Sequence, residues 1–211
     1  MSGLANCTPN LNTLTIMNNT RENDLRIAIY QKPVNPPLID TPYWHTASPA
    51  ANGGRFVIEV PEHYEVYCEY EGLDGGCYRT NIIEIFGSTA LMSVKTTLDD
   101  VTGARTFSLM REQRGETPNH IRVDVPREVG QLIYASIGKS GNPIATFKTP
   151  PTTVADLSVN PTVYLAVISV DLVQGTMIGG IISETEVAVE VGDTATVTGS
   201  KNKGYTITPQ S

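Results

Sequence analysis

One ten-residue phrase occurs twice in the chain, and this repetition constrains the architecture more than any other feature. "FGSTALMSVK" begins at Phe86, and "VGDTATVTGS" begins at Val191, 105 positions later. The two phrases share the pattern Gly-x-Thr-Ala, and a further apolar segment follows each of them. Segments that recur in the same order are the sequence signature of a repeated structural unit.

The repetition extends along most of the chain. The aligned segments are residues 14–30 with 121–137, 56–60 with 153–157, 65–70 with 162–167, and 105–110 with 204–208. The offset is 107 for the first pair and 97 for the next two, so it changes only inside expected loops. This preserved order predicts an internal duplication of one folded unit.

Every repeated segment has the composition and periodicity of a β-strand. Val, Ile, Thr and Tyr dominate these segments, and turn-forming residues bound them. "HYEVYCEYE", which begins at His63, has the period-two alternation of a half-buried strand. No twelve-residue segment has convincing helical periodicity. We therefore expect an all-β fold of two tandem antiparallel β-sandwiches of immunoglobulin-like size, with about seven strands each.

The repeat also predicts the domain boundaries. An N-terminal arm is expected at residues 1–13, a first sandwich at 14–113, a linker at 114–120 and a second sandwich at 121–211. The linker lies in "REQRGETPNH", the most polar stretch of the chain. In the repeated phrases, Gly87 and Gly192 are each expected to form a tight hairpin turn, because glycine tolerates a positive φ.

Charge and hydropathy exclude two classes of partner. Only 18% of the residues are charged, and the net charge is −7. Nucleic-acid binding requires a concentrated basic patch, but the densest basic cluster is Lys201 with Lys203. The apolar stretch Val163–Val173 is too short to span a bilayer. The chain begins without the basic and apolar regions of a secretory signal. This pattern leaves the location open between the cytoplasm and export without a classical leader.

The three cysteines show no zinc-binding spacing. Cys68 aligns with Leu165 at an expected inward position, which favours a small core hydrophobe. A Cys68–Cys77 disulfide that closes a short loop is the alternative. Cys7 lies in the expected arm and either is free or cross-links copies of the chain. No metal or cofactor is expected from these residues.

A weak calcium hypothesis rests on Glu69, Glu71 and Asp74 in "EYEGLDGG". Calcium binds several oxygen ligands that converge from loops, but this spacing is not that of an EF-hand. Acidic loop residues that are simply hydrated are the alternative reading.

No catalytic motif stands out. "GKSG", which begins at Gly138, lacks the preceding glycine and the following helix of a phosphate-binding loop. His45, His63 and His120 have no nearby nucleophile on a strained turn. The sequence therefore predicts that the chain is not an enzyme.

The best candidate for a small-ligand site is a long, proline-rich connection between residues 31 and 54. It contains Tyr43, Trp44 and His45, and Trp44 is the only tryptophan. Aromatic rings pack against the C–H faces of sugars, so this loop fits glycan binding. The alternative is that Trp44 fixes the loop to the sandwich, as large apolar rings usually do.

Two functions follow from these patterns. Tandem sandwiches without a catalytic motif, a surface with few charges and terminal segments able to add to neighbours favour a non-enzymatic structural, self-assembling protein. Its partner would be another copy of the chain, in a homo-oligomer or filament. The alternative is a carbohydrate- or host-surface-binding module that uses the Tyr43-Trp44-His45 loop, with the second sandwich as a spacer.

Overall fold

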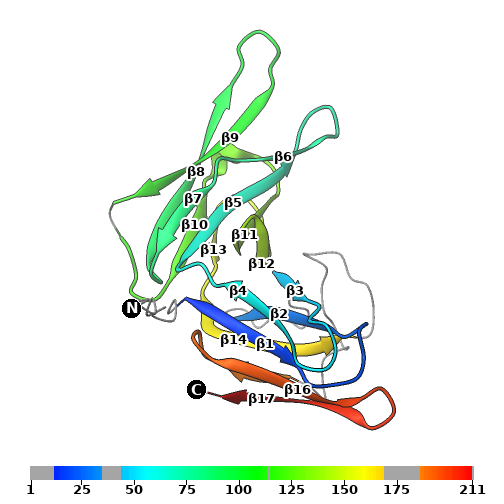
Figure 1. The fold of residues 1–211 in the computed structure, drawn as a ribbon. Helices are drawn as coiled ribbons and strands as arrows, with labels where there is room; N and C mark the ends of the chain where they lie inside the picture. The colour runs from blue at the N-terminus through cyan, green and yellow to red at the C-terminus, as the bar shows by residue number, and fades with distance from the viewer. Residues whose placement is uncertain (1–11, 35–43, 114, 169–185, 211) are drawn as a thin grey trace, which may run out of the picture.

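The chain folds almost entirely into β-strands. A computed structural model describes residues 12–34, 44–113, 115–168 and 186–210. Within these ranges, seventeen strands form four sheets, and helical structure is limited to one 3-10 turn, η1 (Arg127–Val129). The all-β class predicted from the period-two segments is confirmed. The four sheets form two groups, one above the other in Figure 1.

The first group, called sandwich 1, contains the strands nearest both ends of the described chain. Its two sheets have the strand orders β17-β16-β1-β4 and β15-β14-β2-β3. The strands are β1 (Thr13–Asn18), β2 (Arg26–Pro33), β3 (His45–Ala47), β4 (Gly54–Glu59), β14 (Val159–Ile168), β15 (Val187–Val189), β16 (Thr194–Ser200) and β17 (Gly204–Gln210). The rings of His45 and Phe56, one from each sheet, have centroids 5.9 Å apart. The two sheets therefore pack face to face.

The second group, sandwich 2, contains the middle of the chain. Its sheets have the orders β13-β10-β8-β9 and β12-β11-β5-β6, and β7 also pairs with β5. The strands are β5 (His63–Glu71), β6 (Cys77–Arg79), β7 (Ile83–Phe86), β8 (Ala90–Leu98), β9 (Arg105–Glu112), β10 (Ile121–Val125), β11 (Ile133–Lys139), β12 (Asn142–Thr149) and β13 (Thr153–Asp156). Tyr70 and Phe107 meet edge to face, 4.7 Å apart, between these sheets.

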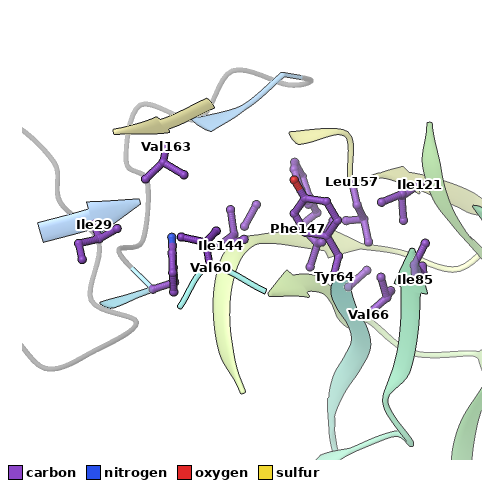
Figure 2. Packing of buried hydrophobic residues seen from close by; sticks show 14 of the residues in the cluster. Ile29, Val60, Tyr64, Val66, Ile85, Ile121, Ile144, Phe147, Leu157 and Val163 are labelled. Carbon is purple, nitrogen blue, oxygen red and sulfur yellow. The ribbon is translucent and has the colours of Figure 1, made fainter. Parts of the chain in front are cut away.

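Alternation of side chains along the strands builds the core. In β1, Leu14 and Ile16 have no exposed surface, while the residues between them are half-buried. One apolar cluster extends through both sandwiches. In Figure 2, Val60 and Ile144 lie between the buried side chains of sandwich 1 and those of sandwich 2. The two sandwiches therefore share a continuous core.

Strands from both predicted repeats are interlaced in every sheet. β1 pairs with β16, and β2 pairs with β14. In sandwich 2, β10 pairs with β8, and β11 pairs with β5. The predicted division into sandwiches at 14–113 and 121–211 is therefore wrong as a description of the folded units. The repeated segments follow one another in the sequence, whereas the hydrogen bonds of each sheet join strands from the first half of the chain to strands from the second half.

The interlacing also changes the expected strand directions. The pairs β1–β16 and β10–β8 are parallel, so two of the four sheets are mixed rather than purely antiparallel. Parallel neighbours cannot be joined by a tight hairpin. Here each such pair joins strands from different halves of the chain, and the long connection runs through other strands.

The two sandwiches have the same strand order when strands of the first half are matched with strands of the second. β1, β2 and β4 occupy the places in sandwich 1 that β10, β11 and β13 occupy in sandwich 2. β14 and β16 likewise correspond to β5 and β8. Cys68 and Leu165 lie on the corresponding strands β5 and β14, and neither has any exposed surface. An internal duplication predicts this matching, although the common origin of the halves itself stays a prediction.

One part of the sequence alignment is displaced by one residue. An offset of 107 matches Ile29 with Ser136. In the sheets, however, Ile29 pairs with Leu165 as Ala135 pairs with Cys68, so Ile29 corresponds to Ala135. Residues on both faces of β2 are buried. The apolar pattern of this strand therefore could not fix which residues point inward.

The repeated glycines lie at turns, but these turns are not hairpins. Gly87 has φ +90°, and Gly192 has φ +106°, so the requirement for glycine is confirmed. Gly87 connects β7 to β8, and these strands belong to the two facing sheets of sandwich 2. Gly192 connects β15 to β16 across sandwich 1 in the same way. Each turn is therefore an arch between sheets, because its strands pair with more distant partners.

Candidate functional site

The predicted ligand loop places its tryptophan in the core. Trp44 is 1% exposed, and its backbone N–H donates to the Ile29 carbonyl at 3.1 Å. His45 begins β3 and contacts the Trp44 ring edge-on, with centroids 6.0 Å apart. Tyr43 lies outside the described residues. Trp44 thus fixes the connection to sandwich 1 and presents no ring face on which a sugar could stack.

The thiols of Cys68 and Cys77 are free, so the alternative of a disulfide between them is wrong. Cys77 lies opposite Glu71 in the β5–β6 pair, three residues away from Cys68 along β5. Cys68 is buried, and burial raises the pKa of its thiol to about 12. Cys7 lies outside the described residues.

The calcium candidates are engaged in separate local contacts. Glu69 accepts a hydrogen bond from the Arg79 guanidinium at 2.7 Å. Asp74 accepts from the Tyr78 hydroxyl at 2.6 Å and from a backbone amide at 3.0 Å. Glu71 is at the exposed end of β5. In the part of the chain that the structure describes, no three such side chains gather as a metal site.

The structure brings together a histidine, an aspartate and a serine that the sequence separates. Asp156 Oδ2 lies 2.7 Å from His120 Nδ1, and Ser158 Oγ lies 3.3 Å from the same nitrogen. The Ser158 hydroxyl donates to Asp156 Oδ1 at 2.6 Å. In a hydrolytic triad, the serine and the carboxylate bond to different ring nitrogens. This serine is therefore held by a carboxylate and is not activated by the histidine.

Sandwich 1 is closed by contacts between two distant parts of the chain, residues 13–59 and residues 159–210. We call these contacts the closure interface. The parallel pair β1–β16 joins them from Thr15↔Thr194 to Asn18↔Val197. On the facing sheet, the antiparallel pair β2–β14 joins them along most of both strands. Neither part contains all the strands of either sheet, so neither buries its apolar face alone.

Charged and hydroxyl groups fasten one end of the closure interface. Glu22 accepts hydrogen bonds from the Lys201 backbone amide at 2.9 Å and from the Tyr205 hydroxyl. These hydrogen bonds lower the pKa of Glu22. Burial, followed by the bond to Glu22, raises the pKa of Tyr205 to about 12. The Lys201 ammonium also lies 2.6 Å from Asp24, although both side chains are about two-thirds exposed.

A second polar cluster lies on the sheet that contains β2 and β14. The rings of Tyr30 and Tyr164 stack with centroids 5.7 Å apart. Glu186 accepts hydrogen bonds from the Tyr30 hydroxyl and from the Lys32 ammonium. Burial, reinforced by the bond to Glu186, raises the pKa of Tyr30. The ammonium of Lys32 also lies 4.4 Å from the Tyr164 ring centre.

Two short connections carry the chain between the sandwiches. Residues 60–62 join β4 to β5, and residues 157–158 join β13 to β14. Because each connection is so short, it also fixes where one sandwich sits against the other.

The outer edges of two sheets are protected against the addition of further strands. Both backbone groups of Leu109 in β9 bond to the Asn81 side chain, at 2.8 Å and 3.0 Å. The edge strand β17 contains Pro209, which has no N–H to donate. Such devices limit edge-to-edge pairing.

A cavity of about 440 Å³ lies where the two sandwiches meet, and we call it the junction cavity. Its apolar wall includes Val60, Ile121, Val159 and Val191, and its polar wall includes Gln31, Tyr64 and Lys139. Lys139 is 4% exposed, and its ammonium donates to the Pro61 carbonyl and lies 4.5 Å from the Tyr64 ring centre. Burial lowers the pKa of Lys139 to about 8.

Sequence reasoning missed these cavity residues. Gln31, Tyr64 and Lys139 lie on β2, β5 and β11, and no local pattern joins them. Lys139 belongs to "GKSG", where Ser140 and Gly141 form a tight turn with φ 51° and 78° between β11 and β12. The motif is thus a hairpin. Only knowledge of the interlaced strand pairing would have placed the lysine beside Gln31.

A comparison with models of known protein families identifies the family of this chain. The family model for RhiA matches residues 9–210. The chain belongs to the RhiA family. Curated proteins gave no match to this family member, and neither did solved structures. Within the described residues of this RhiA chain, no helix has the length and apolar character needed to cross a membrane.

Proposed function

We propose that this RhiA family protein is a non-enzymatic structural protein that assembles by exchanging the closing segments of sandwich 1 between copies. The observation that supports the proposal is the construction of sandwich 1 from two parts, residues 13–59 and 159–210, with sandwich 2 between them. Within one chain the two parts close on each other. Between chains the same strand pairs can form without any new contact.

Such an exchange would extend from one copy of the chain to the next. One chain would give its first part to a neighbour, and its own second part would receive the first part of another copy, so that each copy is linked to two others. This contact is heterologous, and heterologous contacts that do not close into a ring give filaments. The protected edges at Asn81 and Pro209 favour this route over the addition of whole sheets edge to edge.

The connections between the sandwiches determine whether exchange occurs. Short hinge loops favour segment exchange when the closed form strains them, and the connections at residues 60–62 and 157–158 are short. The chain has few charges for its size, which lowers the repulsion between copies.

The test compares two disulfide locks in a background where Cys7 and Cys77 are replaced by serine. Ala28 and Ala166 lie directly opposite in the antiparallel β2–β14 pair. Opposed residues have Cα atoms about 4.5–5.5 Å apart, within the range of a disulfide. The double substitution Ala28→Cys with Ala166→Cys should lock sandwich 1 closed. The matched control is Ala135→Cys, which places a thiol opposite Cys68 in sandwich 2.

Each protein is refolded from urea at high concentration and examined by light scattering. We expect the unlocked protein and the sandwich 2 lock to form oligomers, and the oxidised sandwich 1 lock to remain monomeric. Reduction should restore its assembly. A protein that stays monomeric without any lock, or equal assembly of the oxidised sandwich 1 lock, would contradict the proposal.

The carbohydrate-binding alternative has no observation in its favour, because Trp44 is buried.

A further inference from the structure

The junction cavity contains a positive charge without a negative partner. Among the described residues, no carboxylate oxygen lies within 4 Å of the Lys139 ammonium, although it is 4% exposed. Its contacts are the Pro61 carbonyl and the face of Tyr64. Buried charges are normally paired, because their transfer out of water is costly. An ammonium has three N–H donors, so one carbonyl leaves it with unused donors.

A neutral side chain makes a similar contact in sandwich 1. β2 corresponds to β11 in strand order, and near its end Gln31 donates from Nε2 to the Pro161 carbonyl at 2.7 Å. Gln31 is 2% exposed and also lines the junction cavity. An amide is therefore sufficient to hold a prolyl carbonyl at the start of a strand. The charge of Lys139 is not needed for that contact.

We propose that the junction cavity binds the carboxylate of a small, largely apolar organic acid, with the Lys139 ammonium as its counter-ion. A single cation suits a single negative charge, since a phosphate group calls for more donors than this wall supplies. The apolar wall of Val60, Ile121, Val159 and Val191 would contact the body of the acid. A volume of about 440 Å³ is in the range of small-molecule sites.

The surrounding ionisable groups leave this role to Lys139. Glu62 lies at the cavity wall, and its carboxylate accepts a hydrogen bond from the Asn12 side chain at 2.7 Å. Glu65 on β5 accepts from the Gly141 amide at 2.7 Å. Burial raises the pKa of Tyr64, which keeps its hydroxyl neutral under Lys139. A bound carboxylate would therefore meet the Lys139 cation and the neutral phenol of Tyr64, while the Glu62 carboxylate, also on the wall, is occupied by Asn12.

The experiment is a calorimetric titration of the monomeric full-length protein with sodium butyrate and sodium benzoate, with butyramide as the neutral analogue of butyrate. At about pH 6, well below the pKa of Lys139, we expect both acids to bind and butyramide to bind at least about tenfold more weakly. The affinity for butyrate should fall at about pH 10, where Lys139 has lost its charge.

Lys139→Gln copies the neutral donor of Gln31 and should keep the fold while weakening butyrate binding at least about tenfold. Lys148→Gln removes an exposed lysine from β12 and should leave the affinity unchanged. Absence of binding by the wild type, equal binding by Lys139→Gln, or equal binding of butyramide and butyrate would each overturn the proposal. The pH and butyramide comparisons need no variant. Because the protein is kept monomeric, these results are independent of the assembly proposal.

Discussion

Replacing Trp44 by alanine tests whether the proline-rich connection is fixed to sandwich 1 by packing. The indole is 1% exposed, and its Nε1 has no hydrogen-bond partner among the described residues. The loss is therefore one of apolar contacts and of the cavity left behind. Removal of a buried tryptophan side chain costs about 3–5 kcal/mol. For a chain of this size, that corresponds to a fall in Tm of about 6–20 °C.

The assay is urea unfolding followed by circular dichroism, with Leu73→Ala as the control. Leu73 is 82% exposed, so its removal should change the free energy of unfolding by about 0.5 kcal/mol or less. Because Trp44 is the only tryptophan, acrylamide quenching of the wild type gives a second readout. We expect weak quenching in the native state and strong quenching in urea. A cost below about 1 kcal/mol for Trp44→Ala, or equal quenching in both states, would refute the reasoning.

Three further predictions concern the strand edges, pH and thiol reactivity. Asn81→Ala frees both backbone groups of Leu109, so it should lower the free energy of unfolding by about 1–3 kcal/mol and increase association measured by light scattering. Burial opposes ionisation of Asp156, but its hydrogen bonds outweigh this effect and lower its pKa below 3.8. Urea titrations should therefore show that Asp156→Asn lowers the free energy of unfolding above about pH 4, and that the difference from the wild type disappears as the pH falls through the pKa of the folded state. A thiol reagent at about pH 8 should label Cys77 in the native protein and Cys68 only after unfolding, as mass spectrometry of peptides would show; rapid native labelling of Cys68 would contradict its burial.

The sequence was sufficient to predict the strands and the class of fold. The period-two alternation around Cys68 and the recurrence of Gly87 at Gly192 both reflect local requirements, namely one buried face and a positive φ. Local requirements are visible in a single sequence. The pairing of those strands is not local. Ile29 can bury the same surface against Cys68 of its own half or against Leu165 of the other.

The candidate site was less predictable for the same reason. Trp44 was identified as important, but sequence alone left open whether its ring packs inward or outward. In the sequence, Lys139 stands in a glycine-rich turn, where a lysine is expected to be exposed. Its burial becomes evident only when β11 is known to pair with β5. The pairing of His120 with Asp156 likewise depends on β10 lying next to β13. Each contact follows from strand order, which the repeat alone did not determine.

The central claim, that each sandwich is built from both halves of the chain, is tested most directly by nuclear Overhauser effects between strand backbones in a monomeric sample. The interlaced fold predicts contacts from Ile29 to Leu165 and from Cys68 to Ala135. Two tandem sandwiches built from separate halves would instead give contacts from Ile29 to Cys68 and from Ala135 to Leu165. Observation of the second set in place of the first would contradict the account.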